Sequence, residues 1–340
     1  QEAENPLICI GGGVFAAHAE NEIRKLADLM QIPAITTMMG ISVFPDDDQL
    51  FCGMIGTHGV KMANAAVNEC DVLFLVGARV GDRAVKTPLA LEKTTKIIHI
   101  DIDPAEIGKN IGADLPLVGD AKLVLQQMTE LAKPMKHDEW IAHIKTLGGE
   151  RKYVEPAKGT VNPRVFIDRL AKKMPANVTV VADVGQNQIW TCTEYKFRKE
   201  GRLLTSGGMG TMGYSVPAAI GAKMADNSRA TVAICGDGAF QMSFMELATA
   251  VQFGVDIKVV VMTNNRLGMV RELQTNGYHD RQTAVFLDGS PDFIKLAEAY
   301  GIPAMRVYDD DTMEKGVEML AEHKGICLVE VVVDKDMPTL

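Results

Sequence analysis

Long apolar runs, paired cysteines and an excess of basic side chains are all missing from this sequence. No apolar run approaches the length of a membrane span, so we expect a soluble chain without a membrane partner. The chain has 35 basic and 44 acidic residues, and a net charge of −9 argues against nucleic acid as a partner, because phosphate contacts need clustered Lys and Arg. The six scattered cysteines contain no Cys-x-x-Cys pair, which disfavours a disulfide framework or a structural zinc site and favours a reducing compartment such as the cytoplasm.

Short, β-branched-rich apolar segments alternate with amphipathic ones along the chain. Near-continuous apolar strands separated by helices are typical of parallel α/β sheets that are covered on both faces. The segment between residues 131 and 162 interrupts this rhythm with charge, Gly and Pro. We therefore predict an α/β fold of two doubly wound parallel-sheet domains, residues 1–135 and 161–340, joined by a linker at 136–160. Strands are expected at 7–10, 34–37, 72–76, 96–100, 178–182, 231–234, 258–262 and 327–333, and helices at 19–30, 121–132, 163–173, 243–253 and 291–300.

Two polar motifs of the second domain each follow an apolar strand. They are Ile234-Cys-Gly-Asp-Gly-Ala-Phe240 and Thr263-Asn-Asn-Arg-Leu-Gly268. A right-handed crossover brings the ends of the two strands to the same edge of the sheet, so Asp237 and Asn264 should lie together. Their oxygens suit Mg²⁺, and the glycines at 236 and 238 would let the backbone approach a diphosphate. A Gly-Asp-Gly alone is more often a strand-to-helix turn, but the pair at this spacing predicts a metal–diphosphate site.

Further motifs surround this pair. They are Asp183-Val-Gly-Gln-Asn-Gln-Ile-Trp190, Thr205-Ser-Gly-Gly-Met-Gly-Thr-Met-Gly-Tyr214, Pro217-Ala-Ala-Ile-Gly221 and Leu267-Gly-Met-Val-Arg271. In this order the motifs resemble those of the catalytic subunit of acetolactate synthase (acetohydroxyacid synthase), a family that depends on thiamine diphosphate. The resemblance runs from about Pro6 to the C-terminus and is strongest between residues 183 and 300.

The resemblance implies a role for individual residues of the second domain. Asp237, Asn264 and the backbone carbonyl of Arg266 would bind Mg²⁺. Gly210 would meet the aminopyrimidine ring, and Met212 would be the apolar wedge that bends the cofactor, although one methionine among 19 would otherwise be taken for core. The diphosphate would be held by Gln186, Asn187, Gly238 and Ala239 after the turn at Gly185, and the remaining walls would be Gly236, Met242, Leu267, Gly268, Met269 and Val270.

The first domain carries a weaker motif, Ile10-Gly-Gly-Gly-Val-Phe-Ala16, directly after a strand. It satisfies Gly-x-Gly-x-x-Ala, but no acid follows the second strand at the expected distance to hold a ribose, which disfavours a nicotinamide dehydrogenase. The resemblance implies a structural FAD instead, with Arg79 and Arg83 facing its diphosphate. Val80-Gly81 replaces the usual Phe-Asp, so an empty domain or another adenine nucleotide stays open. The expected FAD residues are Gly11, Gly12, Gly13, Thr37, Met38, Gly56, Thr57, His58, Gly77, Ala78, Arg79, Arg83, Asp101, Ile102, Asp120 and Ala121.

The resemblance also implies the reaction. Pyruvate would be decarboxylated on thiamine diphosphate, and the hydroxyethyl unit would be joined to a second 2-ketoacid, giving 2-acetolactate or 2-aceto-2-hydroxybutyrate for branched-chain amino acid biosynthesis. Leu273 stands where the family has a tryptophan that helps to select the second substrate. The family's activating glutamate belongs to a preceding domain that nothing in this sequence matches, so we expect this chain alone to be inactive. A homodimer or tetramer is expected, and whether a small regulatory subunit joins it stays open.

Two alternatives remain open from the sequence. The chain could belong to another thiamine diphosphate enzyme, of the glyoxylate carboligase or oxalyl-coenzyme A decarboxylase type, which would change the substrate but not the fold or the cofactor. It could also be a non-catalytic nucleotide-binding subunit.

Overall fold

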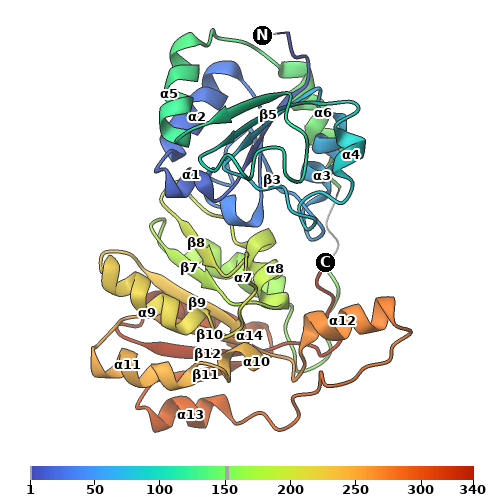
Figure 1. Ribbon diagram of the computed structural model, residues 1–340. Coiled ribbons are helices and arrows are strands. Elements are labelled where there is room, and N and C mark those ends of the chain that lie inside the picture. Colours follow the sequence, from blue (N-terminus) through green and yellow to red (C-terminus); the bar gives the residue numbers. More distant parts are fainter. Residues whose placement is uncertain (1, 150–152) are drawn as a thin grey trace. The chain divides into compact units, whose positions relative to one another are not determined.

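The computed structural model describes residues 2–149 and 153–340. The chain divides into two compact units, Gln1–Arg151 and Lys152–Leu340. Within the described residues, each unit contains one six-stranded sheet whose strands all pair in parallel (Figure 1). The predicted doubly wound α/β architecture is therefore confirmed.

The sheet of the first unit has the strand order β3-β2-β1-β4-β5-β6. This is the dinucleotide-binding order, in which the direction of winding reverses between β1 and β4. The expected strands formed, but β3 and β6 had no clear signal in the sequence: β3 contains a glycine, and β6 is a largely exposed edge strand with a proline at its second position. The strands are β1 (Pro6–Ile10), β2 (Ala34–Thr36), β3 (Phe51–Met54), β4 (Val72–Val76), β5 (Lys96–Asp101) and β6 (Leu115–Val118).

Helices cover both faces of the first sheet. α2 (Glu20–Met30) and α5 (Ala121–Leu131) lie side by side on one face, and α3 (Lys61–Glu69) and α6 (Asp138–Leu147) on the other (Figure 1). Alternate residues of β1 point to the two cores: Ile8 and Ile10 toward α2, Leu7 and Cys9 toward α3. Three short helical turns complete the unit: α1 (Gly13–Ala16), η1 (Met38–Gly40) and α4 (Pro88–Leu91).

Helix α6 lies inside the segment that the sequence indicated as a linker. Its Trp140 is buried and donates its indole N–H to the carbonyl of Pro6 over 2.9 Å, and Ile144, one turn later, is buried in the same core. The first unit therefore extends beyond residue 135, because an apolar pair spaced by four residues gives α6 a face to bury. Charge and proline around the helix masked this signal.

The second sheet has the order β11-β12-β10-β9-β7-β8, and its winding reverses between β7 and β9. Its central strands are buried throughout, which is why the sequence predicted them; β8 and β11 lie at the edges and were not predicted. The strands are β7 (Thr179–Ala182), β8 (Arg202–Thr205), β9 (Thr231–Gly236), β10 (Lys258–Thr263), β11 (Ala304–Val307) and β12 (Cys327–Val332).

The helices of the second unit also form two layers. One face of the sheet is covered by α9 (Ser215–Ala225), α10 (Asp237–Phe240), α11 (Leu247–Gln252) and α13 (Phe293–Ala299), and the other by α7 (Pro163–Lys173), α8 (Gln186–Glu194) and α14 (Asp310–Glu322). The single helix expected at 243–253 is wrong: Ser243, with φ of −146° and ψ of 8°, is not helical, and a 3₁₀ turn, η2 (Phe244–Glu246), precedes α11. α12 (Gly268–Gly277) follows β10. In the ranges that the structure covers, every helix falls short of the length and apolarity needed to cross a bilayer.

Candidate functional site

Asp237 begins helix α10 directly after β9, at the point where the second sheet reverses its winding. Its side chain is buried, and one carboxylate oxygen accepts the backbone N–H of Gly238 over 2.8 Å. The other oxygen accepts the N–H groups of Asn264 (3.2 Å) and Asn265 (2.6 Å), which follow the neighbouring strand β10. Burial raises the pKa of the Asp237 carboxyl to about 6, and these N–H groups oppose the rise. The two motifs of the sequence thus meet at one sheet edge.

The side-chain amide of Asn264 is held on both sides. Its Nδ2 donates to Oε1 of Gln186 over 3.2 Å, and its Oδ1 accepts the backbone N–H of Arg266 over 3.1 Å. Asn265 adopts the left-handed conformation with φ of 54°, which turns the chain sharply here. The Arg266 guanidinium pairs with Asp288 at 2.9 Å and also donates to the backbone carbonyl of Asn265 over 2.7 Å.

Gly238 marks a close approach of three segments. A Cβ atom at this position would lie 2.9 Å from Cδ2 of Leu267 and 3.4 Å from Cε of Met212. The structure therefore brings Met212 and Leu267 together at Gly238. Ala239 is buried beside them and Gly210 is exposed with a φ of 67°, whereas Met242 and Val270 are largely exposed at the margin and Met269 is half-buried.

The glycine-rich segment at 205–214 is fastened by Asp183, a residue that sequence reasoning quoted but gave no role. The fully buried carboxylate of Asp183 accepts the backbone N–H groups of Gly213 (3.0 Å) and Ser215 (2.7 Å). It also accepts the N–H of Val184 over 2.9 Å. The sequence signal for this role is an acidic residue immediately after an apolar strand. A charged side chain at such a buried position is stable only when its oxygens are fully hydrogen-bonded.

The N-terminus of α8 points to the same reversal of winding. Gly185, with a φ of 141°, allows the turn from β7 into the helix. The Nδ2 of Asn187 donates to the carbonyls of Asp183 (2.8 Å) and Ile234 (3.2 Å), so this side chain braces the ends of β7 and β9. The side chain of Gln186 is engaged with Asn264 and with the C-terminal residues. What α8 offers to an anion is therefore its first backbone N–H groups.

In the first unit, the expected FAD residues lie at the carboxyl ends of the strands and in the loops and first helical residues that follow them. Gly11 and Gly13 have a packing role there: a Cβ atom on Gly11 would lie 2.0 Å from the carbonyl oxygen of Gly77, and one on Gly13 would lie 2.7 Å from its Cα. The Asp120 carboxylate caps α5 by accepting the N–H of Leu123 over 3.1 Å. Arg79 and Arg83 are exposed, Ile102 is 71% exposed, and His58 is half-buried.

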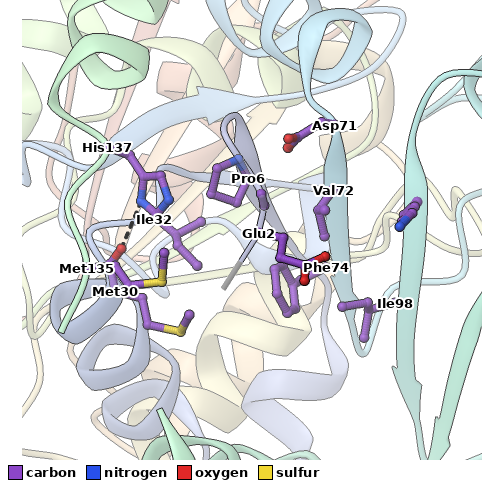
Figure 2. Close-up of a pocket in the computed structure, with 12 residues that line it drawn as sticks. Glu2, Pro6, Met30, Ile32, Asp71, Val72, Phe74, Ile98, Met135 and His137 are labelled. Atoms are coloured by element: carbon purple, nitrogen blue, oxygen red, sulfur yellow. Dashed lines mark hydrogen bonds between the residues drawn. The ribbon is translucent and has the colours of Figure 1, made fainter. Parts of the chain in front are cut away.

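A cavity of about 440 Å³ opens at the opposite, amino-terminal edge of the first sheet (Figure 2). Its walls are mainly apolar and include Ile32, Phe74 and Ile98. His137 lies at its side, with Nδ1 donating to the carbonyl of Met30 over 3.0 Å. The cavity contains none of the residues singled out in the sequence.

Known families match both units. The central domain of thiamine pyrophosphate enzymes matches residues 1–128, and the C-terminal TPP-binding domain of the same enzymes matches residues 183–331. The chain belongs to the thiamine pyrophosphate enzyme family. Thiamine pyrophosphate is the thiamine diphosphate of the sequence analysis, so the cofactor family indicated by the motifs is confirmed.

Individual relatives cover nearly all of the chain. A probable acetolactate synthase large subunit of Methanocaldococcus jannaschii is 40% identical over 98% of the chain and 58% of the relative. The acetolactate synthase large subunit of Lactococcus lactis is 35% identical over the same shares. That of Corynebacterium glutamicum is 40% identical over 90% of the chain and 51% of the relative. The resemblance to acetolactate synthases is confirmed, and the chain spans somewhat more than half the length of these relatives.

Proposed function

We propose that the protein acts as an acetolactate synthase large subunit that binds Mg²⁺ and thiamine diphosphate where the second sheet reverses its winding. One observation carries the proposal: Asp237 and Asn264 meet beside the N-terminus of α8, within a domain that matches the TPP-binding model. When bound, thiamine diphosphate supplies the electron sink for decarboxylating one 2-ketoacid and joining the remaining unit to a second.

The residues present fit a magnesium ion. The buried Asp237 carboxylate receives its hydrogen bonds from backbone N–H groups, so a cation would supply the missing positive charge. Asn264 would add its amide oxygen and Arg266 its backbone carbonyl. Among the described residues no group of three His, Cys, Asp or Glu side chains could hold a metal. A site of this composition therefore needs diphosphate and water oxygens to reach six ligands.

The chain's own groups would orient the cofactor. The backbone N–H groups of Gln186, Asn187, Gly238 and Ala239 would hold the diphosphate, because glycine at 238 keeps the approach open. Met212 would set the bend between the two rings from its place against Gly238. The two hydrogen bonds that Asp183 accepts from Gly213 and Ser215 would keep the loop that carries Gly210 and Met212 in position.

For the first unit we propose a structural FAD at the edge where β1 and β4 end. The strand order and the two exposed arginines, Arg79 and Arg83, support this assignment. The reaction transfers no net electrons, so the flavin would hold the fold. The relatives' description as large subunits favours assembly as a homodimer or tetramer together with a small regulatory subunit. A purified protein that carries flavin absorbance would support the FAD assignment.

The decisive test is the product formed from pyruvate by the protein of the complete gene, with Mg²⁺ and thiamine diphosphate. Acetolactate is expected. Acetaldehyde, or no consumption of pyruvate, would overturn the synthase assignment and point to another thiamine diphosphate enzyme.

A further inference from the structure

The side-chain amide of Gln186 can take only one orientation. Its Nε2 faces three acceptors: the carbonyl of Met337 (2.9 Å), the hydroxyl of Thr339 (3.2 Å) and a carboxylate oxygen of Glu272 (3.2 Å). The carbonyl and the carboxylate can only accept, and the hydroxyl donates its single proton to Glu272. An amide oxygen facing this group would meet three lone pairs, so the nitrogen must lie there.

This orientation determines the orientation of Asn264. Oε1 of Gln186 lies on the opposite side of its amide and accepts Nδ2 of Asn264 over 3.2 Å. The Oδ1 of Asn264 is consequently turned toward the backbone N–H of Arg266. The oxygen and nitrogen of an amide are nearly identical in shape, and only the hydrogen-bond partners decide which one faces a given side.

We infer that Thr339, Glu272 and the carbonyl of Met337 act through Gln186 to turn the amide oxygen of Asn264 toward the cation. They are positioning residues that lie 86 to 153 residues away from Gln186 in the sequence. The inference rests on the proposed magnesium–diphosphate site. It assigns to the C-terminal residues a function in metal binding.

Burial makes the arrangement rigid. Gln186, Met337 and Thr339 are each at least 96% buried, so water has little access to replace a lost partner. Gly268 lies against the amide: a Cβ atom there would be 1.9 Å from Oε1 of Gln186. Residues 337–339 are also held by a second contact, in which the indole N–H of Trp190 donates to the carbonyl of Pro338 over 3.1 Å. This contact does not involve the amide of Gln186.

The test measures binding of Mn²⁺ in the presence of saturating thiamine diphosphate, from the electron paramagnetic resonance signal of free Mn²⁺. Gln186→Met removes the hydrogen bonds on both sides of the amide, those from Nε2 and the one to Oε1. It should raise the Kd for Mn²⁺ by about tenfold or more, the usual effect of losing an outer-shell partner. Thr339→Val should raise it several-fold. Thr339→Ser keeps the hydroxyl, and Trp190→Phe removes only the hydrogen bond to the carbonyl of Pro338. The Kd for Mn²⁺ of both variants should therefore stay within about twofold of the wild-type value.

An unchanged Kd in Gln186→Met, or equal losses in Thr339→Val and Trp190→Phe, would overturn the inference. Failure of the wild-type protein to bind Mn²⁺ with thiamine diphosphate would instead overturn the proposed cofactor site, and the two failures are thus distinguishable. Hydrogen exchange of the wild type gives a check that does not depend on a variant folding. Coupling between sites is reciprocal, so Mg²⁺ with thiamine diphosphate should slow exchange of the Thr339 amide, which donates to Glu272. Unchanged exchange would contradict the inference.

Discussion

The carboxylate of Asp183 accepts the backbone N–H of Ser215 over 2.7 Å, although 32 residues separate them in the sequence. Its other oxygen accepts the N–H of Gly213. Asp183 directly follows β7 and Ser215 begins α9, so this one buried side chain fixes both ends of the turn that leads from Met212 into the helix. The position of Met212, the proposed wedge residue, therefore depends on Asp183, which bonds the residues that follow it.

Replacing Asp183 by asparagine should destabilise the second unit. An amide has one acceptor oxygen, so its NH₂ group would face a backbone N–H and leave a buried donor unpaired, at a cost of about 1–3 kcal/mol for each such group. Urea unfolding should show the loss as a lower midpoint. Asp226→Asn is the matched control, since the Asp226 carboxylate is exposed and accepts the backbone N–H and the hydroxyl of Ser228, two residues on. Equal midpoints for the two variants would contradict the structural role of Asp183.

Two glycines of the first unit differ in whether their surroundings leave room for a side chain. Gly11→Ala places a methyl group 2.0 Å from the Gly77 carbonyl and should lower the free energy of unfolding by about 1–3 kcal/mol. Gly81→Ala meets nothing within 4 Å and should change it by less than about 0.5 kcal/mol. Thermal unfolding of the two variants provides the measurement. A stable Gly11→Ala protein would mean that the glycines of this motif serve a ligand rather than the packing of β1 against β4.

Leu273 offers a test of second-substrate choice. It lies on α12 with 61% of its surface exposed, and the resemblance implies a tryptophan at this position in the family. In the protein of the complete gene, Leu273→Trp should increase the share of 2-aceto-2-hydroxybutyrate over acetolactate when pyruvate and 2-ketobutyrate compete, because a larger ring offers more apolar contact to the longer substrate. Leu89→Trp, on an exposed residue of the first unit, should leave the product ratio unchanged. An unaltered ratio in Leu273→Trp would remove this residue from substrate selection.

The sequence predicted what depends on local pattern. The strand at Lys258–Thr263 is buried at every position, so its continuous apolar run is unmistakable, and the motif that follows it had to lie at the carboxyl edge of the sheet. The edge strand Leu115–Val118 carries no such run, because one side of it lacks a neighbour and most of its residues are exposed. Two polar motifs, each placed by a strong strand, were sufficient to predict that Asp237 and Asn264 lie together.

What the sequence could not predict are the contacts that order the site. No sequence pattern indicates that the side chain of Asn187 braces two strand ends. Gln186 bonds Thr339, 153 residues away, and no periodicity or motif connects residues at such a distance. Buried polar side chains take whatever partner the tertiary fold provides, and that partner is decided by packing rather than by local sequence.

Metal-dependent binding of thiamine diphosphate tests the central claim most directly. Calorimetric titration should show binding to the wild type only when Mg²⁺ is present. Asp237→Ala should weaken it by more than about 100-fold, because loss of an outer-shell partner alone already costs about 10–100-fold. Asp288→Asn, which alters an exposed acid paired with the Arg266 guanidinium, should bind like the wild type. Binding that is independent of Mg²⁺, or equally strong in Asp237→Ala, would contradict a magnesium–diphosphate site at Asp237 and Asn264.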